Sequence, residues 1–293
     1  MNFFIKKLLL LVMIICYAPS MVWSVDKQIS INSYFKPGSN LLTVTNMLLE
    51  ELPKRGWKVD IKYTQNCALS RLLYEQSEKP MMVIWGSDRL ADETNACALP
   101  LVEKEFIHVA YAHSDFMCTA RKDITSINDL RDPARPIKIG IRKDALAQVI
   151  ANDMINKARF NIVPIKYENS GALNKALAAG EVDVIFNSAG PRLVKENKAH
   201  CLFVTNDTPV VGARPMKEIA DGFERANLKY IFFLMAKGLS PELQELLRQD
   251  MSNIVAGEKY QNWLSENKFY NFTGHKAGLI ATKQSINDQM IQR

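Results

Sequence analysis

The sequence lacks the short motifs by which many enzymes are identified. It contains no Gly-x-Ser-x-Gly nucleophile elbow, no Walker phosphate-binding loop and no paired-cysteine zinc motif. Its 4 histidines do not have the spacing of metal ligands, so we expect each one at the surface or in the core. They are His108, His113, His200 and His275. We therefore predict a protein that is not an enzyme and has no catalytic residues, no metal and no cofactor.

A strong excess of charge of one sign is also missing. The chain has 37 basic and 31 acidic residues, and loss of Lys6 and Lys7 with the leader described next leaves 35 basic residues and a net charge of +4. So small an excess, spread along the chain, is not the footprint of a nucleic-acid-binding protein, and we expect no nucleic-acid partner. It is compatible with a small anionic ligand.

Beyond its first residues, the sequence has no apolar run long enough to span a bilayer. Residues 1–24 have the pattern of a secretory signal peptide, with a charged Lys6-Lys7, an apolar stretch from Leu8 to Tyr17, and a suitable cleavage site at Val22-Trp23-Ser24. We expect cleavage before Val25, which leaves 269 of the 293 residues in a soluble periplasmic protein. An uncleaved anchor is the alternative.

Cysteine is scarce, but its number is informative. Four cysteines remain once the signal peptide is removed, and an even number in an exported chain indicates disulfides. Three pairings are possible. We predict Cys67–Cys97 and Cys118–Cys201, because each pair falls within a plausible neighbourhood; four free thiols are the alternative.

The stretch from Ile29 to Asn40 is the one around which we expect the fold to be organised. It alternates like a strand, breaks at Pro37-Gly38, and offers Ser39 or Asn40 as the cap of an apolar helix. Backbone N–H groups at such a helix start, backed by the helix dipole, receive anions without a charged side chain. We therefore expect this turn to grip a small acidic solute. An ordinary turn between a strand and a helix is the alternative.

Strands and helices then continue to alternate along the chain. Strands are expected at 57–63 and 80–85, and a second series of strands and helices runs over 137–186. This order predicts parallel sheets with right-handed crossovers. An apolar strand at 230–236 and the helices after it predict a return of the chain to the first sheet.

The fold class that follows is α/β, with two lobes hinged as a clamshell and a mainly parallel sheet flanked by helices in each. We place 25–120 with 237–293 in the first lobe and 121–236 in the second. Ligands of parallel sheets bind beyond the carboxyl ends of the strands.

The candidate ligand-binding residues lie in the strand-end loops. In the first lobe they are Ser33, Tyr34, Phe35, Gly38, Ser39, Asn40 and Ser87; in the second lobe they are Arg142, Ser170, Gly171 and Asn187. Arg142 follows a strand and opens a helix, so its guanidinium could clamp a carboxylate through two hydrogen bonds. A solvated surface arginine is the alternative for Arg142, and core residues are the alternative for Tyr34 and Phe35.

Four stretches resemble the solute receptors of tripartite tricarboxylate transporters, the TctC or Bug family. They are Tyr34–Asn40, Tyr167–Ala172, Ala178–Phe186 and Phe232–Pro241, which lie in the family's order and span most of the mature chain. The match of Gly180-Glu181-Val182-Asp183-Val184 to a Gly-Glu-Val-Asp-Val segment is the closest. The chain departs from the family at Lys36-Pro37, at Ser39, and at Leu42 where many members carry an Asp.

The resemblance implies a monomeric, two-lobed periplasmic binding protein that delivers a small organic acid to integral-membrane transporter subunits. It implies ligand binding by backbone amides, small side chains and water. Two alternatives share the fold: a solute-binding protein of an ABC transporter or of a sensor, and a periplasmic two-lobed enzyme. The departures mean that the resemblance does not identify the ligand.

Overall fold

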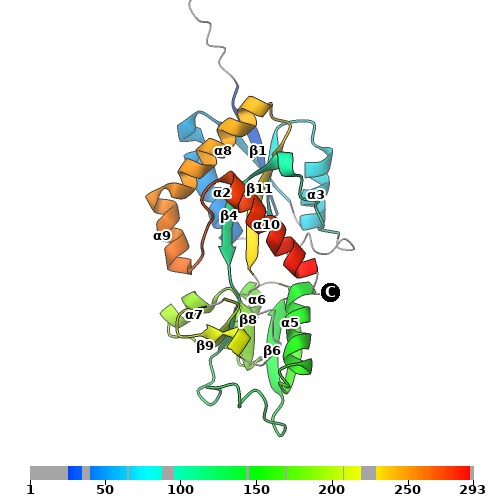
Figure 1. Cartoon of the computed structure of the whole chain (residues 1–293), viewed down its shortest axis with the longest axis vertical. Coiled ribbons are helices and arrows are strands. Elements are labelled where there is room, and N and C mark those ends of the chain that lie inside the picture. The colour runs from blue at the N-terminus through cyan, green and yellow to red at the C-terminus, as the bar shows by residue number, and fades with distance from the viewer. Residues whose placement is uncertain are drawn as a thin grey trace, which may run out of the picture.

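The computed structural model describes residues 26–34, 40–64, 66–87, 96–142, 145–168, 170–206, 208–218 and 229–290. These residues form two α/β lobes that follow one another along the longest axis of the molecule (Figure 1). The first lobe is built on a five-stranded sheet and the second on a six-stranded sheet. The predicted fold class, two α/β lobes with helices flanking each sheet, is confirmed.

The sheet of the first lobe has the strand order β2-β1-β3-β11-β4. β1 pairs in parallel with β2 and β3, whereas β11 runs antiparallel between β3 and β4. The elements of this lobe are β1 (Gln28–Ser33), α2 (Asn40–Glu51), η1 (Pro53–Arg55), β2 (Lys58–Tyr63), α3 (Cys67–Gln76), β3 (Met81–Gly86), η2 (Glu103–Glu105), β4 (Phe106–His113), β11 (Tyr230–Lys237), α8 (Pro241–Ala256), α9 (Glu258–Asn267) and α10 (His275–Met290).

The sheet of the second lobe has the strand order β10-β9-β5-β8-β6-β7. β6 pairs in parallel with β7 and β8, and β5 runs antiparallel between β8 and β9. The elements of this lobe are β5 (Phe116–Thr119), β6 (Ile137–Arg142), α5 (Ala145–Asn156), β7 (Ile162–Tyr167), α6 (Ser170–Ala178), β8 (Val184–Asn187), α7 (Gly190–Lys195), β9 (His200–Val204), β10 (Arg214–Pro215) and η3 (Met216–Glu218).

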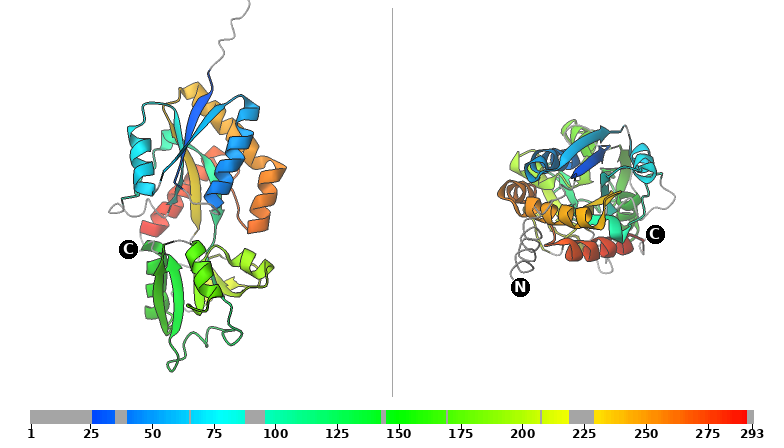
Figure 2. Two further views of the ribbon diagram at one scale, coloured as in Figure 1. Left: turned by 180° about the vertical axis from the view of Figure 1, so that it is seen from behind. Right: turned by 90° about the horizontal axis from the view of Figure 1, so that it is seen from above.

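Helices cover both faces of the first sheet (Figure 2). Leu48 of α2 and Leu247 of α8 are buried in the apolar cluster on one face, while Tyr74 of α3 and the half-buried Leu279 of α10 belong to the cluster on the other. β3 is buried along its whole length because its Met81–Trp85 run is apolar on both faces. A strand of this kind belongs in the centre of a sheet, which is where β3 lies.

The chain changes sheets over a link of two residues, Ser114 and Asp115, which separates β4 from β5. It has returned to the first sheet by Tyr230, the first residue of β11. The predicted boundary at residue 120 places β5 in the first lobe, although β5 belongs to the second sheet. The predicted boundary at residue 236 places β11 in the second lobe, although β11 belongs to the first sheet. The physical reason is that the polar break at His113-Ser114-Asp115 is short, and a break of this length is equally typical of a turn between two strands of one sheet. The division of the chain into domains otherwise stays a prediction.

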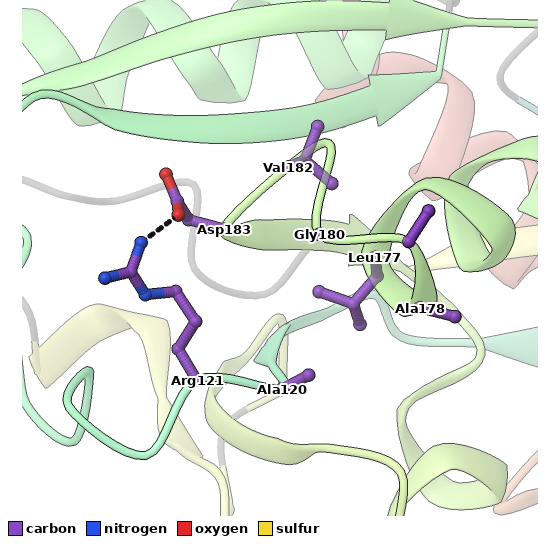
Figure 3. Close-up of a pocket in the computed structure, with 8 residues that line it drawn as sticks. Ala120, Arg121, Leu177, Ala178, Gly180, Val182 and Asp183 are labelled. Carbon is purple, nitrogen blue, oxygen red and sulfur yellow. Dashed lines mark hydrogen bonds and ion pairs between the residues drawn. The ribbon is translucent and has the colours of Figure 1, made fainter.

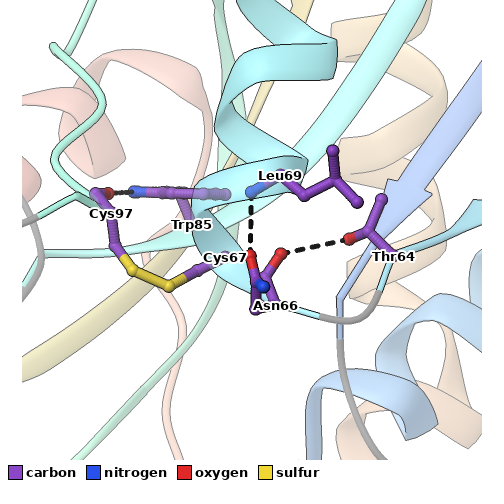
Figure 4. Close-up of a disulfide and its surroundings, with 6 residues drawn as sticks. All are labelled: Thr64, Asn66, Cys67, Leu69, Trp85 and Cys97. Carbon is purple, nitrogen blue, oxygen red and sulfur yellow. Dashed lines mark hydrogen bonds between the residues drawn. A yellow bond between two sulfur atoms is a disulfide. The ribbon is translucent and has the colours of Figure 1, made fainter.

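Two disulfides are present, and both are the predicted ones. Cys67, in the first turn of α3, is joined to Cys97 (Figure 4). Cys118 of β5 is joined to Cys201 of β9, its register partner across an antiparallel pair. Each disulfide therefore stays within one lobe and leaves the link between the lobes unconstrained.

The predicted signal peptide lies outside the described residues. Among the helices that the structure does describe, none combines the length and the apolar character needed to cross a bilayer.

Candidate functional site

The carboxyl ends of the parallel strands of both lobes lie at the junction between the lobes. In the first lobe, the end of β3 pairs with the beginning of β11, because Gly86 is opposite Phe232. In the second lobe, β6 ends at Arg142, and the guanidinium carbon of Arg142 lies 5.0 Å from the centre of the Tyr230 ring, at the first residue of β11. The two sets of strand ends therefore face one another across the junction, the place where ligands of such sheets bind.

Arg142 is the predicted site residue whose placement is most informative. Its side chain is 17% exposed, and its Nη2 lies 3.6 Å from Oδ2 of the fully buried Asp115. It is therefore held between the lobes by an ion pair and an aromatic ring, which is not how a solvated surface arginine is placed. A guanidinium in such surroundings is weakly screened by water, so its interactions with charged groups are stronger than those of a surface arginine.

Ser33 ends β1 at the same junction. Its side chain is buried, and its hydroxyl has no hydrogen-bond partner among the described residues. A buried hydroxyl without a partner costs about 1–3 kcal/mol, so such groups usually serve a ligand or a bound water. Asn32, one residue earlier, donates from Nδ2 to the Ser70 carbonyl at 2.7 Å, while its Oδ1 and the Ser70 hydroxyl have no partner in the described part of the chain.

Three other predicted residues lie at helix starts, although Ser170 and Gly171 were expected in the loop before the helix. Asn40 is the first residue of α2, and Ser170 and Gly171 are the first two residues of α6. Asn40 and Ser170 are half-buried and Gly171 is exposed. The N-termini of α2 and α6, with their backbone N–H groups, therefore lie next to the loops that follow β1 and β7.

Ser87 and Asn187 are also buried at strand ends, but both already have protein partners. The Ser87 hydroxyl oxygen accepts from the Ile231 N–H at 3.1 Å and from the Ser285 hydroxyl at 2.9 Å. Asn187 donates to Asn174 Oδ1 at 3.1 Å and accepts from the Ala189 N–H at 2.9 Å. These contacts hold the strand ends in place.

Tyr34 follows β1, and its ring centre lies 5.3 Å from that of Trp85. Trp85 in turn donates from Nε1 to the Cys97 carbonyl at 3.1 Å, beside the first disulfide (Figure 4). Tyr34 thus joins a core cluster, as the alternative interpretation had it. The remaining predicted residues of the first lobe, Phe35, Gly38 and Ser39, lie outside the described residues.

Sequence reasoning missed three residues at the junction. Asp115 and His113 are both buried, with His113 Nδ1 3.5 Å from Asp115 Oδ1, and Tyr230 is fully buried beside them. A signal for Asp115 was available, since it is the one carboxylate within the mainly apolar 106–118 stretch. The partner of Tyr230 could not be found from the sequence, because Arg142 lies far from it along the chain.

The second lobe has a surface hollow of about 430 Å³ between the end of α6 and the beginning of β8 (Figure 3). It is lined by Ala120, Arg121, Leu177, Ala178, Ala179, Gly180, Val182 and Asp183. These residues follow the end of β5, end α6 and precede β8, whereas the predicted site residues lie at the opposite ends of α6 and β8. An ion pair between Arg121 and Asp183 closes one side of the hollow, and hydrogen bonding to Asp183 raises the pKa of Arg121.

Within the described ranges, no group of three or more His, Cys, Asp or Glu side chains is arranged to hold a metal ion. Two α/β lobes with opposed strand ends, joined at β4 and β5 by a link of two residues, have the architecture of a two-lobed binding protein.

Comparisons with known proteins agree with that architecture. No family model matches the chain, and no curated protein matches it in sequence. Among solved structures, the periplasmic binding protein BugD superposes with a TM-score of 0.74 at 13% identity, covering 91% of this chain and 96% of that one. An R. palustris protein solved with adipate gives 0.70 at 14% identity, covering 90% and 94%. MatC from Rhodopseudomonas palustris, with bound malate, gives 0.70 at 11% identity, covering 90% and 97%.

This chain is thus similar in fold to periplasmic binding proteins of the Bug and TctC kind. The likeness covers both lobes, and the fold is the one that the sequence resemblance implied.

Proposed function

We propose that the chain is a periplasmic solute receptor, which captures a small organic acid between its two lobes and delivers it to the integral-membrane subunits of a transporter. The observation that carries this proposal is the placement of Arg142, whose guanidinium is sheltered at the junction where the strand ends of both lobes meet. Two proteins similar in fold were solved with adipate and with malate, both of them carboxylates.

The ligand-binding set that we propose comes from both lobes. Ser33 and Asn40 contribute from the first lobe and Arg142, Ser170 and Gly171 from the second, together with the first-lobe residues Phe35, Gly38 and Ser39 assigned from the sequence. The helix starts at Asn40 and Ser170 offer N–H groups to carboxylate oxygens, and Arg142 supplies the charge. Ser87 and Asn187 shape the strand ends rather than contact the ligand, because their side chains bind the protein.

Capture works by closure of the lobes. A ligand that touches both lobes favours the closed form by the difference between its affinities for the closed and the open form. The closed form then docks on the transporter. We expect the protein to act as a monomer, to reach the periplasm through a cleaved signal peptide, and to catalyse no reaction on its ligand.

A ligand screen by thermal unfolding tests this function. The purified mature protein is heated with malate, adipate, other di- and tricarboxylates, aromatic acids and amino acids, one at a time. At a ligand concentration of 100 times Kd, binding stabilises the fold by about 2.7 kcal/mol, which raises the melting temperature by several degrees. At least one acid is expected to do so. Absence of any shift across the panel contradicts the proposal, and turnover of an acid would favour the two-lobed enzyme.

The transporter class is a separate question, which neighbouring genes answer. Genes for one large and one small integral-membrane subunit beside this gene favour the tripartite system. A neighbouring ATPase gene favours an ABC transporter instead.

A further inference from the structure

Four side chains from four segments meet at the junction between the lobes, and we call them the junction cluster: His113, Asp115, Arg142 and Tyr230. His113 ends β4 and Tyr230 begins β11, both in the first sheet, whereas Arg142 ends β6 in the second sheet. Asp115 lies in the two-residue link between β4 and β5. Contacts within the cluster therefore depend on how the two lobes are oriented.

Asp115 is held firmly by its backbone. Its N–H donates to the Thr205 hydroxyl at 2.9 Å, and its carbonyl accepts from the Thr205 N–H, also at 2.9 Å. Thr205 directly follows β9 of the second sheet. These two bonds continue the pairing of β5 with β9, so the link between the lobes is anchored to the second sheet at Asp115.

The carboxylate of Asp115 is completely buried and has cationic or polar groups on two sides. Arg142 Nη2 lies 3.6 Å from its Oδ2, and His113 Nδ1 lies 3.5 Å from its Oδ1. A buried carboxylate is tolerated only when it is paired. This charge therefore restricts where the Arg142 guanidinium can rest.

Tyr230 restricts Arg142 from the other lobe. The guanidinium carbon lies 5.0 Å from the centre of the Tyr230 ring, within the range of a cation–π contact. The same ring also stacks on His113, with ring centres 5.1 Å apart and planes inclined by 8°. Tyr230 is itself fully buried, so its ring has little freedom to move and limits the positions open to the guanidinium.

We propose that Asp115 and Tyr230 are positioning residues that hold Arg142 in its ligand-binding orientation and, through it, fix the angle between the lobes in the free protein. The inference rests on the proposed function for the role of Arg142 towards the ligand. The part that concerns the lobe angle does not need a ligand. The stack joins the Tyr230 ring of the first lobe to the Arg142 guanidinium of the second lobe. Removing the ring therefore lets the arginine side chain move and lets the angle between the lobes vary.

The experiment compares Tyr230→Leu with its matched control Tyr230→Phe, which keeps the ring and removes only the hydroxyl. Asp115→Asn serves as an independent variant that removes the charge and keeps the shape. Each change is made in a protein carrying Lys62→Cys and Lys198→Cys, two exposed positions in the first and second lobes, for nitroxide spin labels. The four remaining cysteines of the mature chain are consumed by the two disulfides. Pulsed electron resonance then reports the distribution of distances between the lobes without any ligand.

The distance distribution is expected to broaden or shift in Tyr230→Leu and Asp115→Asn and to stay as in the parent in Tyr230→Phe. If Asp115→Asn fails to fold, the comparison of the two Tyr230 variants decides. Identical distributions in the leucine and phenylalanine variants overturn the inference.

The second readout is the affinity for malate and adipate, measured by calorimetry on the same variants. Freeing one side chain that binding must then order again weakens affinity by roughly tenfold, so Tyr230→Leu is expected to lose about that factor and Tyr230→Phe to lose little. Equal affinities in the two variants contradict a positioning role. If the parent binds neither acid nor any other acid of the panel, the proposed function fails, while the distance measurement still decides the inference on the lobe angle.

Discussion

The guanidinium of Arg142 stacks on the ring of Tyr230 at 5.0 Å, although the two residues end and begin strands of different sheets. This contact joins the lobes at the point where the fold class places its ligand. The same guanidinium also pairs with Asp115, which lies in the two-residue segment that connects the lobes. The candidate binding residue is therefore in contact with that connecting segment.

The Asp115–Arg142 pair gives a first prediction about stability. Arg142→Gln leaves the buried Asp115 carboxylate without its cation, and breaking a buried pair in this way costs about 3–5 kcal/mol. Urea unfolding monitored by tryptophan fluorescence measures the loss. The double variant Arg142→Gln with Asp115→Asn is expected to recover part of it, since the uncompensated charge is then gone. Strictly additive losses would show that the two side chains do not interact.

Ser87 gives a prediction that separates the structural from the ligand-binding interpretation. In Ser87→Ala, the buried Ile231 N–H loses its side-chain acceptor, whereas the Ser285 hydroxyl keeps the Lys229 carbonyl as an acceptor. The free energy of unfolding is expected to fall by about 1–3 kcal/mol, while the affinity for an organic acid stays the same. A stable variant with weakened acid binding would return Ser87 to the ligand-binding set.

The disulfides give a third prediction. Cys118–Cys201 closes a separation of 83 residues and Cys67–Cys97 one of 30. A disulfide that closes a longer loop restrains the unfolded chain more. Loss of Cys118–Cys201 is therefore expected to lower the free energy of unfolding by about 4.6 kcal/mol, and loss of Cys67–Cys97 by about 3.7 kcal/mol. Paired Cys→Ala variants, compared by urea unfolding, measure both. Greater destabilisation by Cys67→Ala with Cys97→Ala would contradict the loop-length argument.

A fourth prediction concerns pH and His108. Burial lowers the pKa of this histidine below 6.5, and the charge of His275 acts in the same direction, whereas the bond to the Val109 carbonyl opposes them. The neutral ring is therefore favoured in the fold, so its contribution to stability is present above pH 6.5 and is lost as the pH falls below that value.

His108→Gln removes this titration. Its melting temperature is expected to fall less between pH 7 and pH 5 than that of the parent protein, while between pH 8 and pH 7 the two change alike. Parallel curves down to pH 5 would exclude His108 as a source of acid sensitivity.

Local patterns were enough to predict the elements that depend on neighbouring residues. The alternation of Lys58–Tyr63 and the apolar run of Met81–Trp85 both predict the observed strands correctly. The two disulfides were also predicted correctly, because only three pairings of four cysteines exist.

Contacts between distant parts of the chain could not be predicted. The partners of Ser87 lie 144 and 198 residues away, so nothing near Ser87 indicates that its hydroxyl is occupied. The link at Ser114 and Asp115 was missed because a short polar break between two apolar strands is also typical of a turn within one sheet. The partners of Ser87 and the position of the link both depend on tertiary contacts, which the pattern of neighbouring residues does not specify.

The most direct test of the account is calorimetric titration of the mature protein and of its Arg142→Gln and Arg142→Lys variants with the acid that stabilises the parent most in the thermal screen. The account predicts stoichiometric binding to the parent, a partial loss in the lysine variant, which keeps the charge but not the fork of donors, and a loss of at least about tenfold in the glutamine variant. Equal binding by all three proteins, or no binding of any organic acid by a folded parent, would contradict it.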